Sequence, residues 1–311
     1  MVCRRQQRYL LLLLLHLKSS SVCASWGWER MHVDTVSPLR DIFVVDDISA
    51  WVVGDNDTIL ESRDGGLTWA LRQILPPTLS SVPSTSKTSN TTNSSVPDVL
   101  SHSSRQWFGV SFANKSCGWI VGSNASVLHT VNGGFNWTLQ VTGLPTSRAL
   151  HAVHAVSPEI VFMVGEVSTI IKSADGGATW ELLNVPEVED GTSGDLYTVG
   201  FVGPDLGWAA GVTNLPGKGF LTHDGGTTWQ VNYPEAMTWT HTSKVYFEQE
   251  RGVGWIVGPG GLVFSSGDAG YSWRELTSCT SKDLNGVTLD SATGVGFLVG
   301  PIAKNYVMLV D

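Results

Sequence analysis

Apolar residues two positions apart recur at six places along the chain, and each pair is followed by a second repeated pattern. The pairs are Ile42/Val44, Val110/Phe112, Val153/Ala155, Val199/Phe201, Val245/Phe247 and Val287/Leu289. Alternation with a period of two is typical of a half-buried β-strand. The second pattern is an aromatic residue, two apolar residues and glycine, at 51–54, 119–122, 162–165, 208–211, 255–258 and 297–300. The sequence therefore predicts two neighbouring strands in each of six repeats.

An eight-residue segment follows five of these strand pairs. Its copies are SRDGGLTW (62–69), TVNGGFNW (130–137), SADGGATW (173–180), THDGGTTW (222–229) and SGDAGYSW (266–273). A short Asp or Asn side chain accepts backbone hydrogen bonds within a tight turn, and glycine adopts angles that other residues resist. The closing tryptophan offers a large apolar face for packing. We expect turn-locking roles for Asp64, Asn132, Asp175, Asp224 and Asp268, and packing roles for Trp69, Trp137, Trp180, Trp229 and Trp273.

Five copies identify the segment as the Asp-box (BNR) repeat, which is found in sialidases, sortilins and other β-propellers. Successive units start 42 to 46 residues apart from Trp107 onward, a period typical of four-stranded propeller blades. We therefore predict an all-β fold, a six-bladed β-propeller of four-stranded antiparallel blades. The last unit has no box, and residues 28–33 resemble the segment that follows each box. We expect this N-terminal strand to lie beside 306–309, complete the last blade and close the ring.

The N-terminus is predicted to be a secretory signal peptide, residues 1–24. Arg4, Arg5 and Arg8 precede a short apolar run, and Val22 and Ala24 suit a cleavage site. An uncleaved anchor is the alternative, and no later stretch is apolar enough for a membrane helix. Residues 25–311 are predicted to form a single propeller domain. Within it, 76–105 has the Ser/Thr/Asn/Pro-rich composition of a disordered loop insertion.

Composition limits the classes of partner. The chain has 311 residues, 34 glycines, 13 tryptophans and a net charge of −9, and it becomes more acidic if the basic signal is removed. An acidic body argues against binding to nucleic acid or to anionic membranes. Cys3 and Cys23 lie in the signal, whereas Cys117 and Cys279 fall on opposite sides of the predicted ring. We expect no disulfide between these two.

Candidate catalytic residues are few. A glycosidase needs two carboxylates that face one cleft, and Asp41, Asp55, Glu166 and Asp205 are conceivable, although solvated turn residues are the alternative. The arginines are scattered, and the sialidase Phe/Tyr-Arg-Ile-Pro segment is absent. We predict no catalytic residue and no cofactor.

Candidate metal ligands are few, whereas candidate modification sites are more numerous. His151 and His154 are three apart on a predicted strand, which makes them a poor metal pair, and His223 should be exposed. An acidic loop could hold calcium, but a solvated linker is favoured; it contains Glu187, Glu189, Asp190 and Asp195. We predict no metal. Six Asn-x-Ser/Thr triplets are candidate glycosylation sites: Asn56, Asn90, Asn93, Asn114, Asn124 and Asn136.

The stretch CGWIVGSNASVLHTVNGGFNW (117–137) combines both repeated patterns. In this respect the chain resembles the photosystem II stability/assembly factor family of cyanobacteria and plastids. The resemblance implies a non-catalytic protein of the thylakoid lumen that binds a newly made photosystem II reaction-centre subunit. Family members are seven-bladed, often lack boxes in their middle blades and bind partly through an arginine-rich patch, and this chain departs from all three features.

Two functions stay open at this point. The first is a protein-binding scaffold for photosynthetic complex biogenesis, located in the thylakoid lumen of a plastid reached through the secretory route. The alternative is a secreted carbohydrate-binding or glycoside-hydrolase-like (sialidase-type) Asp-box propeller. The predicted signal peptide places either protein in the secretory pathway.

Overall fold

The computed structural model describes residues 10–15, 27–31, 35, 37–72, 104–186, 194–212, 219–232, 243–248, 252–276, 281, 283–290, 295–300 and 306–310. These residues form strands and two 3₁₀ turns, η1 (Ser123–Ala125) and η2 (Pro259–Gly261). No helix among them is long and apolar enough to cross a bilayer.

Five sheets have four strands each, and each sheet consists of strands that follow one another in sequence. The first blade is β3 (Leu39–Val44), β4 (Ala50–Gly54), β5 (Ile59–Ser62) and β6 (Ala70–Leu71). The second is β7 (Trp107–Phe112), β8 (Gly118–Gly122), β9 (Val127–Thr130) and β10 (Thr138–Gln140). The third is β11 (Leu150–Ala155), β12 (Val161–Gly165), β13 (Thr169–Ser173) and β14 (Glu181–Leu182). The fourth is β15 (Asp195–Val202), β16 (Leu206–Val212), β17 (Gly219–Thr222) and β18 (Gln230–Asn232). The fifth is β19 (Lys244–Phe247), β20 (Gly254–Val257), β21 (Val263–Ser266) and β22 (Arg274–Leu276).

The remaining sheet, called the terminal sheet here, has five strands in the order β2-β1-β25-β24-β23. Its strands are β1 (Leu10–Leu15), β2 (Gly27–Met31), β23 (Gly286–Asp290), β24 (Val295–Gly300) and β25 (Tyr306–Val310). The prediction of six four-stranded blades is therefore wrong, because only five blades have four strands. The predicted pairing of 28–33 with 306–309 is also wrong, since β1 lies between β2 and β25 and pairs in parallel with β25.

The physical reason for this error lies in the run of leucines at 10–15. A continuous apolar run carries no alternation, so its pattern cannot distinguish a strand from the core of a signal peptide. Its backbone groups can nevertheless form a ladder with any neighbouring strand. The signal peptide at residues 1–24 stays a prediction, as does the loop at 76–105, most of which lies outside the described residues.

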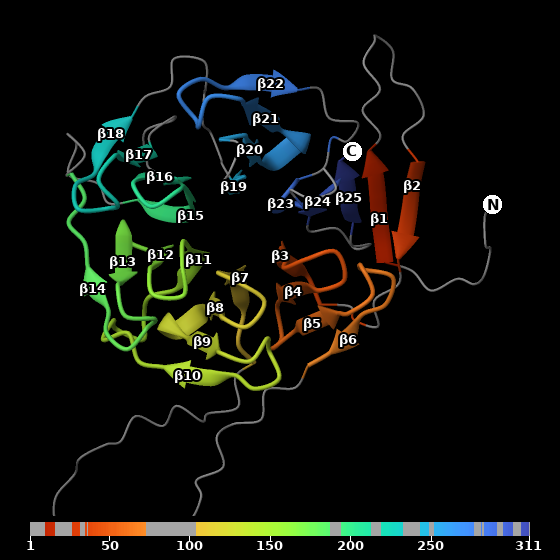
Figure 1. Ribbon diagram of the computed structural model, residues 1–311, viewed down its shortest axis with the longest axis horizontal. Helices are drawn as coiled ribbons and strands as arrows, with labels where there is room; N and C mark the ends of the chain where they lie inside the picture. Colours follow the sequence, from red (N-terminus) through yellow and green to blue (C-terminus); the bar gives the residue numbers. More distant parts are fainter. Residues whose placement is uncertain are drawn as a thin grey trace, which may run out of the picture.

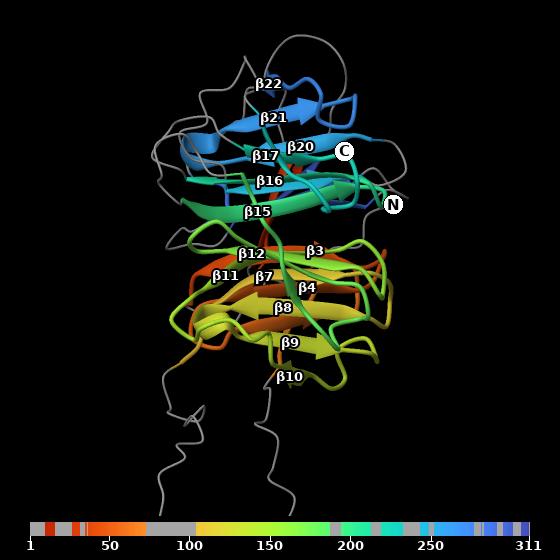
Figure 2. The same ribbon diagram turned by 90° about the vertical axis from the view of Figure 1, so that its left-hand side faces the viewer.

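The sheets are arranged around a central axis (Figure 1). The first strand of each blade lies innermost, and β3, β7, β11, β15, β19 and β23 contact one another in that order, with β23 returning to β3. Figure 2 shows from the side that the strands run along this axis. The ring therefore has two faces. The start face is the one at which the inner strands begin, and the box face is the opposite one, where the box turns lie.

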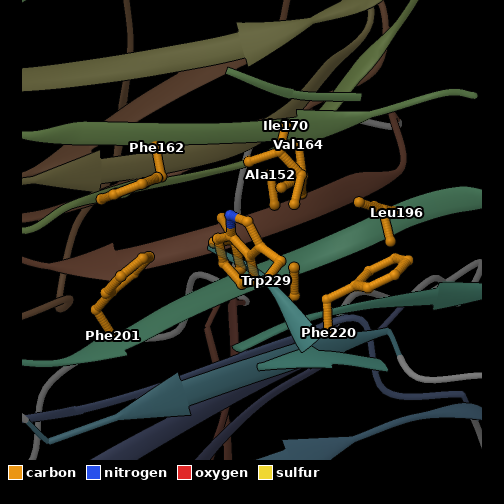
Figure 3. Close-up of a cluster of buried hydrophobic side chains, with 10 residues drawn as sticks. Ala152, Phe162, Val164, Ile170, Leu196, Phe201, Phe220 and Trp229 are labelled. Atoms are coloured by element: carbon orange, nitrogen blue, oxygen red, sulfur yellow. The ribbon is translucent and has the colours of Figure 1, made fainter. Parts of the chain in front are cut away.

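Apolar side chains from neighbouring blades fill the space between them. Between the third and fourth blades, Phe162 stacks on Phe201 with ring centroids 4.1 Å apart, and Trp229 meets Phe201 edge-on at 6.2 Å (Figure 3). All three are at least 96 % buried. Equivalent clusters lie between the other four-stranded blades. The aromatic residues of both repeated patterns thus hold adjacent blades together by burial of large apolar surfaces.

Candidate functional site

One extra residue interrupts the pairing of the inner strand in each of the first four blades. The register shifts lie between Leu39/Asp41, Trp107/Gly109, Leu150/Ala152 and Leu196/Thr198. A β-bulge of this kind bends a strand and redirects a side chain, and bulges are frequent next to functional sites. The residues at the bulges are Arg40, Phe108, His151 and Tyr197, which we call the bulge row. They occupy the same position in four successive blades, near the start face.

The glycine of the repeated aromatic pattern makes each bulge possible. In the third blade Gly165 pairs with Leu150, and a Cβ atom at Gly165 would overlap the carbonyl oxygen of Ala149. Gly54 and Gly122 make the same close approach to the residue before their inner strands, and Gly211 makes it to the first residue of β15. The chain therefore needs glycine here for close backbone contact rather than for a turn. The second repeated pattern and the bulge row have one structural cause.

Side chains of the bulge row contact one another across the blade boundaries. The Arg40 guanidinium carbon lies 5.9 Å from the centre of the Phe108 ring. The Phe108 and His151 ring centroids are 5.3 Å apart, and those of His151 and Tyr197 are 4.6 Å apart. All four side chains are half-buried. The row presents a cation and three rings in sequence, an arrangement that favours stacking and cation–π contacts with a ligand.

Charges around the row are largely balanced. Arg40 forms a bidentate ion pair with Asp55, with Nε–Oδ1 and Nη2–Oδ2 distances of 2.9 and 2.8 Å. Burial lowers the pKa of His151, and the nearby carboxylates of Asp195 and Glu166 oppose this shift. Burial raises the pKa of Tyr197, and the same two carboxylates add to the effect. At neutral pH the three rings are therefore uncharged.

A buried ion pair adjoins the bulge row, because Asp41 directly follows Arg40 on β3. Lys244 Nζ donates to Asp41 Oδ2 at 2.6 Å, and the backbone N–H of Val110 donates to the same oxygen at 3.0 Å. Both charged side chains are almost fully buried, with 11 % and 2 % of their surface exposed. Close to Lys244 lies His154, whose pKa is lowered to about 4 by burial and by the lysine charge. His154 is therefore neutral at physiological pH.

Side chains also satisfy backbone groups on the free edge of the inner strands, which have a ladder partner on one side only. Thr198 Oγ1 accepts from the N–H of Val245 at 2.7 Å, and Ser111 Oγ accepts from the N–H of Ala155 at 3.1 Å. Asp41 Oδ2 accepts from the N–H of Val110 in the same way. In each case the side chain comes from the preceding blade, so these bonds connect successive blades. Four buried side-chain atoms on the described inner strands have no hydrogen-bond partner: Asp41 Oδ1, His151 Nε2, His154 Nε2 and Thr288 Oγ1.

The four carboxylates considered for glycosidase chemistry are not gathered at one place. Asp41 binds Lys244, Asp55 binds Arg40, and Glu166 Oε2 accepts from the N–H of Ala149 at 3.0 Å. Asp205 is exposed and lies beside the fourth box, on the opposite face from Asp55, since its carbonyl accepts from the N–H of Gly225. Three of the four are committed to structural contacts.

Arginines that are scattered in sequence come to the same face. Arg105 and Arg148 each lie two residues before the inner strand of the second and third blades, and Arg40 lies at the first bulge. Arg148 Nη1 donates to Thr169 Oγ1 at 2.9 Å, and the N–H of Arg105 donates to Asp57 Oδ2 at 3.1 Å. The start face of the first three blades thus carries three arginines around the bulge row.

In four of the five boxes the Asp side chain makes the same hydrogen bonds within its turn. In the third box, Asp175 Oδ1 accepts from Ser173 Oγ at 2.8 Å and from the N–H of Thr179 at 2.8 Å, and Oδ2 accepts from Thr179 Oγ1 at 2.6 Å. These bonds lower the pKa of Asp175 to about 2. Asp64, Asp224 and Asp268 have equivalent partners. Both oxygens of each of these carboxylates therefore accept hydrogen bonds from groups of the same turn.

The other sequence candidates lie apart from the row or outside the described residues. His223 is exposed on the box face, where its ring stacks on Tyr271 with centroids 6.2 Å apart. Cys117 is a free, half-buried thiol whose pKa burial raises, and Cys279 lies outside the described residues. Of the acidic loop only Asp195 is described, and its Oδ1 accepts from the N–H of Val167. Within the described residues no group of three or more potential ligands could hold a metal ion.

Sequence reasoning did not single out the bulge row, although it examined His151 as a metal ligand. A signal was present. The glycine that ends each aromatic pattern indicates a close approach of two backbone segments. In the first four repeats, the second residue of the inner strand or the residue at its bulge is Arg, Phe, His or Tyr, at positions 40, 108, 151 and 197. Alternation alone could not reveal the row, because a bulge breaks the period-two pattern at that residue.

The amino-acid sequence matches a known protein family. The family model described as "Photosynthesis system II assembly factor YCF48" matches residues 20–82 and 91–187, which is just over half of the chain. The Photosystem II assembly protein Ycf48 of Synechococcus sp. (strain JA-2-3B'a(2-13)) is 24 % identical over 88 % of this chain and 86 % of its own length. The chloroplastic Photosystem II stability/assembly factor HCF136 of Arabidopsis thaliana is 27 % identical over 77 % of this chain and 58 % of its own length.

A solved structure described as "YCF48 bound to D1 peptide" has the same fold. It superposes with a TM-score of 0.53 at 20 % sequence identity, and the match covers 96 % of this chain and 99 % of that one. At this identity the likeness concerns the propeller fold alone. The match of the family model over more than half of the residues carries the conclusion that this chain belongs to the Ycf48 family of photosystem II assembly factors.

Proposed function

We propose that this protein is a non-catalytic assembly factor that binds a peptide segment of a photosystem II reaction-centre subunit on its start face. Family membership supports the role in assembly, and the similar protein bound to a D1 peptide supports the class of ligand. The observation that carries the proposal is the bulge row, because four consecutive blades use the same backbone irregularity to present a side chain at one place.

The chemistry of the row favours an extended peptide with apolar or aromatic side chains. Phe108, His151 and Tyr197 offer uncharged ring faces, on which aliphatic, proline or aromatic groups can pack. Arg105 and Arg148 lie at the same end of the ring and suit acidic groups or a carboxylate on the same peptide, whereas Asp55 balances the charge of Arg40. No catalytic step is proposed, since Asp41, Asp55 and Glu166 are held in structural contacts.

The place of action that we propose is a thylakoid lumen reached by way of a secretory signal. The Arabidopsis relative is chloroplastic, and residues 1–24 have the basic start, apolar run and small residues of a signal peptide. Imaging of the full-length protein, tagged at its C-terminus, in its own cells tests this directly. Fluorescence outside plastids would contradict it.

Peptide binding is the decisive experiment. Synthetic peptides that tile the lumenal segments of D1 are titrated against the purified chain and three variants. Phe108→Ala and Tyr197→Ala should each weaken binding at least tenfold, since truncation of an aromatic anchor commonly costs more than about 1.4 kcal/mol. Phe135→Ala is the matched control, because Phe135 is an exposed aromatic residue on the box face. Equal affinity in all four proteins, or loss only with the control variant, would refute the proposed site.

A further inference from the structure

The second box differs from the other four at two coupled positions. In the boxes of the other blades an Asp is followed four residues later by Thr or Ser, whose hydroxyl donates to the Asp Oδ2 at 2.5 or 2.6 Å. In the second box these positions are Asn132 and Asn136. The backbone N–H of Asn136 still donates to Asn132 Oδ1 at 2.9 Å, so the turn is formed. The second box therefore lacks the hydroxyl–carboxylate hydrogen bond, and the side-chain amide of Asn136 takes no part in holding the turn.

The Asn136 side-chain amide is exposed, and Asn136 is the first residue of an N-glycosylation triplet. Asn136, Trp137 and Thr138 form an Asn-x-Thr triplet. Asn136 is exposed, and its side chain makes no hydrogen bond to any part of the chain that the structure describes. We propose that Asn136 carries an N-linked glycan in the protein that enters the secretory pathway. This inference rests on the secretory signal of the proposed function, but it does not depend on the bulge row.

Other triplets of the described residues fit a glycan less well. Asn56 Nδ2 donates to Ser37 Oγ at 3.2 Å at the edge of the start face, so a sugar there would break a contact. Asn114 uses its Oδ1 to hold the N–H groups of Ser116 and Cys117 at 2.8 and 2.9 Å. Asn124 lies on the start face with a left-handed φ of 59°. Asn90 and Asn93 lie outside the described residues.

The surface around Asn136 supplies a second, independent argument. Phe135 and Val131, in the same turn, are 71 % and 67 % exposed. Apolar surface that is left in contact with water is unfavourable, so a group that covers it is stabilising. The Arg63 guanidinium carbon lies 4.4 Å from the centre of the Phe135 ring and covers one side of it. The C–H groups of the first sugar on Asn136 can pack on the remaining apolar surface of the Phe135 ring.

The covalent step uses a lipid-pyrophosphate-linked oligosaccharide of the endoplasmic reticulum as glycosyl donor. The Asn136 Nδ2 forms a bond to C1 of the first sugar, while the bond from C1 to the pyrophosphate oxygen breaks. The amide nitrogen loses one proton, and the lipid pyrophosphate leaves with the bonding electrons. No oxidant or reductant takes part. The product keeps one N–H on the amide and adds a neutral, hydrated group to the box face.

The full-length chain, translated in the presence of endoplasmic-reticulum microsomes, tests this proposal. Protease-protected protein is treated with peptide:N-glycosidase, which leaves aspartate at each occupied asparagine, and the conversion is read by mass spectrometry. We expect conversion at position 136, and its loss in both Asn136→Gln and Thr138→Ala. Asn124→Gln is the matched control and should keep the conversion at 136. The readout does not require the variants to be stable.

Three results would overturn the proposal. They are protected chains with unconverted Asn136, conversion at 136 that persists in Thr138→Ala, and a chain that stays outside the microsomes. None of these results bears on peptide binding, because binding is measured on unglycosylated protein with start-face variants. The two proposals can therefore fail separately.

Discussion

Lys244 and Asp41 form an ion pair of 2.6 Å although 203 positions separate them and their blades are not adjacent. The inner strand β23 of the terminal sheet lies between their strands β19 and β3 and contacts both. The lysine side chain therefore reaches past the terminal sheet and joins the fifth blade to the first. The five four-stranded blades are linked into a ring by this bond as well as by the strands of the terminal sheet.

Lys244→Met tests the energetic importance of this pair. The variant leaves Asp41 buried with one backbone donor and no counter-ion, and breaking a buried pair in this way costs about 3–5 kcal/mol. The free energy of unfolding, measured by denaturant titration, should fall by that amount. The double variant Asp41→Leu/Lys244→Met removes both charges and should recover only part of the loss, because the N–H of Val110 then has no acceptor. A single variant within about 1 kcal/mol of the wild type would show that the pair contributes little to closure.

Gly165→Ala tests whether the bulge row depends on the glycine of the aromatic pattern. The added methyl group would overlap the Ala149 carbonyl, so the start of β11 must move and His151 must leave its place between Phe108 and Tyr197. We expect weaker peptide binding and a loss of stability of about 1–3 kcal/mol. Gly143→Ala is the control: Gly143 has a φ of 76° and nothing within 4 Å of the added atom. Gly143→Ala should lower the free energy of unfolding through backbone strain, but it should leave peptide affinity unchanged.

Asp175→Asn tests the box carboxylates through their pH dependence. The folded-state pKa of Asp175 is lowered from 3.8 to about 2, chiefly by the Thr179 hydroxyl. A lowered carboxyl pKa stabilises the fold above the unfolded pKa, and that contribution disappears as the pH falls through the folded pKa. The difference in unfolding free energy between wild type and variant should therefore be constant above about pH 5 and shrink towards pH 2. A difference that grows on acidification would contradict this assignment.

Thr198→Val tests the bonds that connect successive inner strands. The hydroxyl of Thr198 is the acceptor for the N–H of Val245, and both residues are buried. Loss of the hydroxyl leaves a buried donor unsatisfied, at a cost of about 1–3 kcal/mol. Thr198→Ser keeps the hydroxyl and serves as the control. Equal destabilisation by both variants would mean that the methyl group, not the hydrogen bond, is important.

The regular parts of the fold could be predicted because their causes are local. Alternating apolar residues such as Val153 and Ala155 place the inner strands, and the box sequence places the turns, since both patterns act within a few residues. The same reasoning failed at the terminal sheet. Which strand lies beside β25 depends on a competition between β1 and β2 for one edge, and such a competition leaves no mark on the period of either segment.

The candidate site was predictable only in part, for a related reason. His151 attracted attention as an ionisable residue, but its importance comes from Phe108 and Tyr197, which lie in other blades. Contacts between repeats depend on the angle between neighbouring sheets, which the sequence pattern does not report. The start-face position of Arg105 and Arg148 has the same origin, because residues that are far apart in sequence become neighbours only when the ring closes.

The repeated bulge separates recognition from stability. Each bulge is fixed by a glycine and by buried neighbours, whereas the side chain at its tip is half-buried and differs from blade to blade. Exchange of one tip residue therefore alters the surface offered to a ligand, while the buried aromatic clusters between the blades stay in place. Because each tip side chain also contacts the next one, a change in one blade alters the environment of its neighbour in the row.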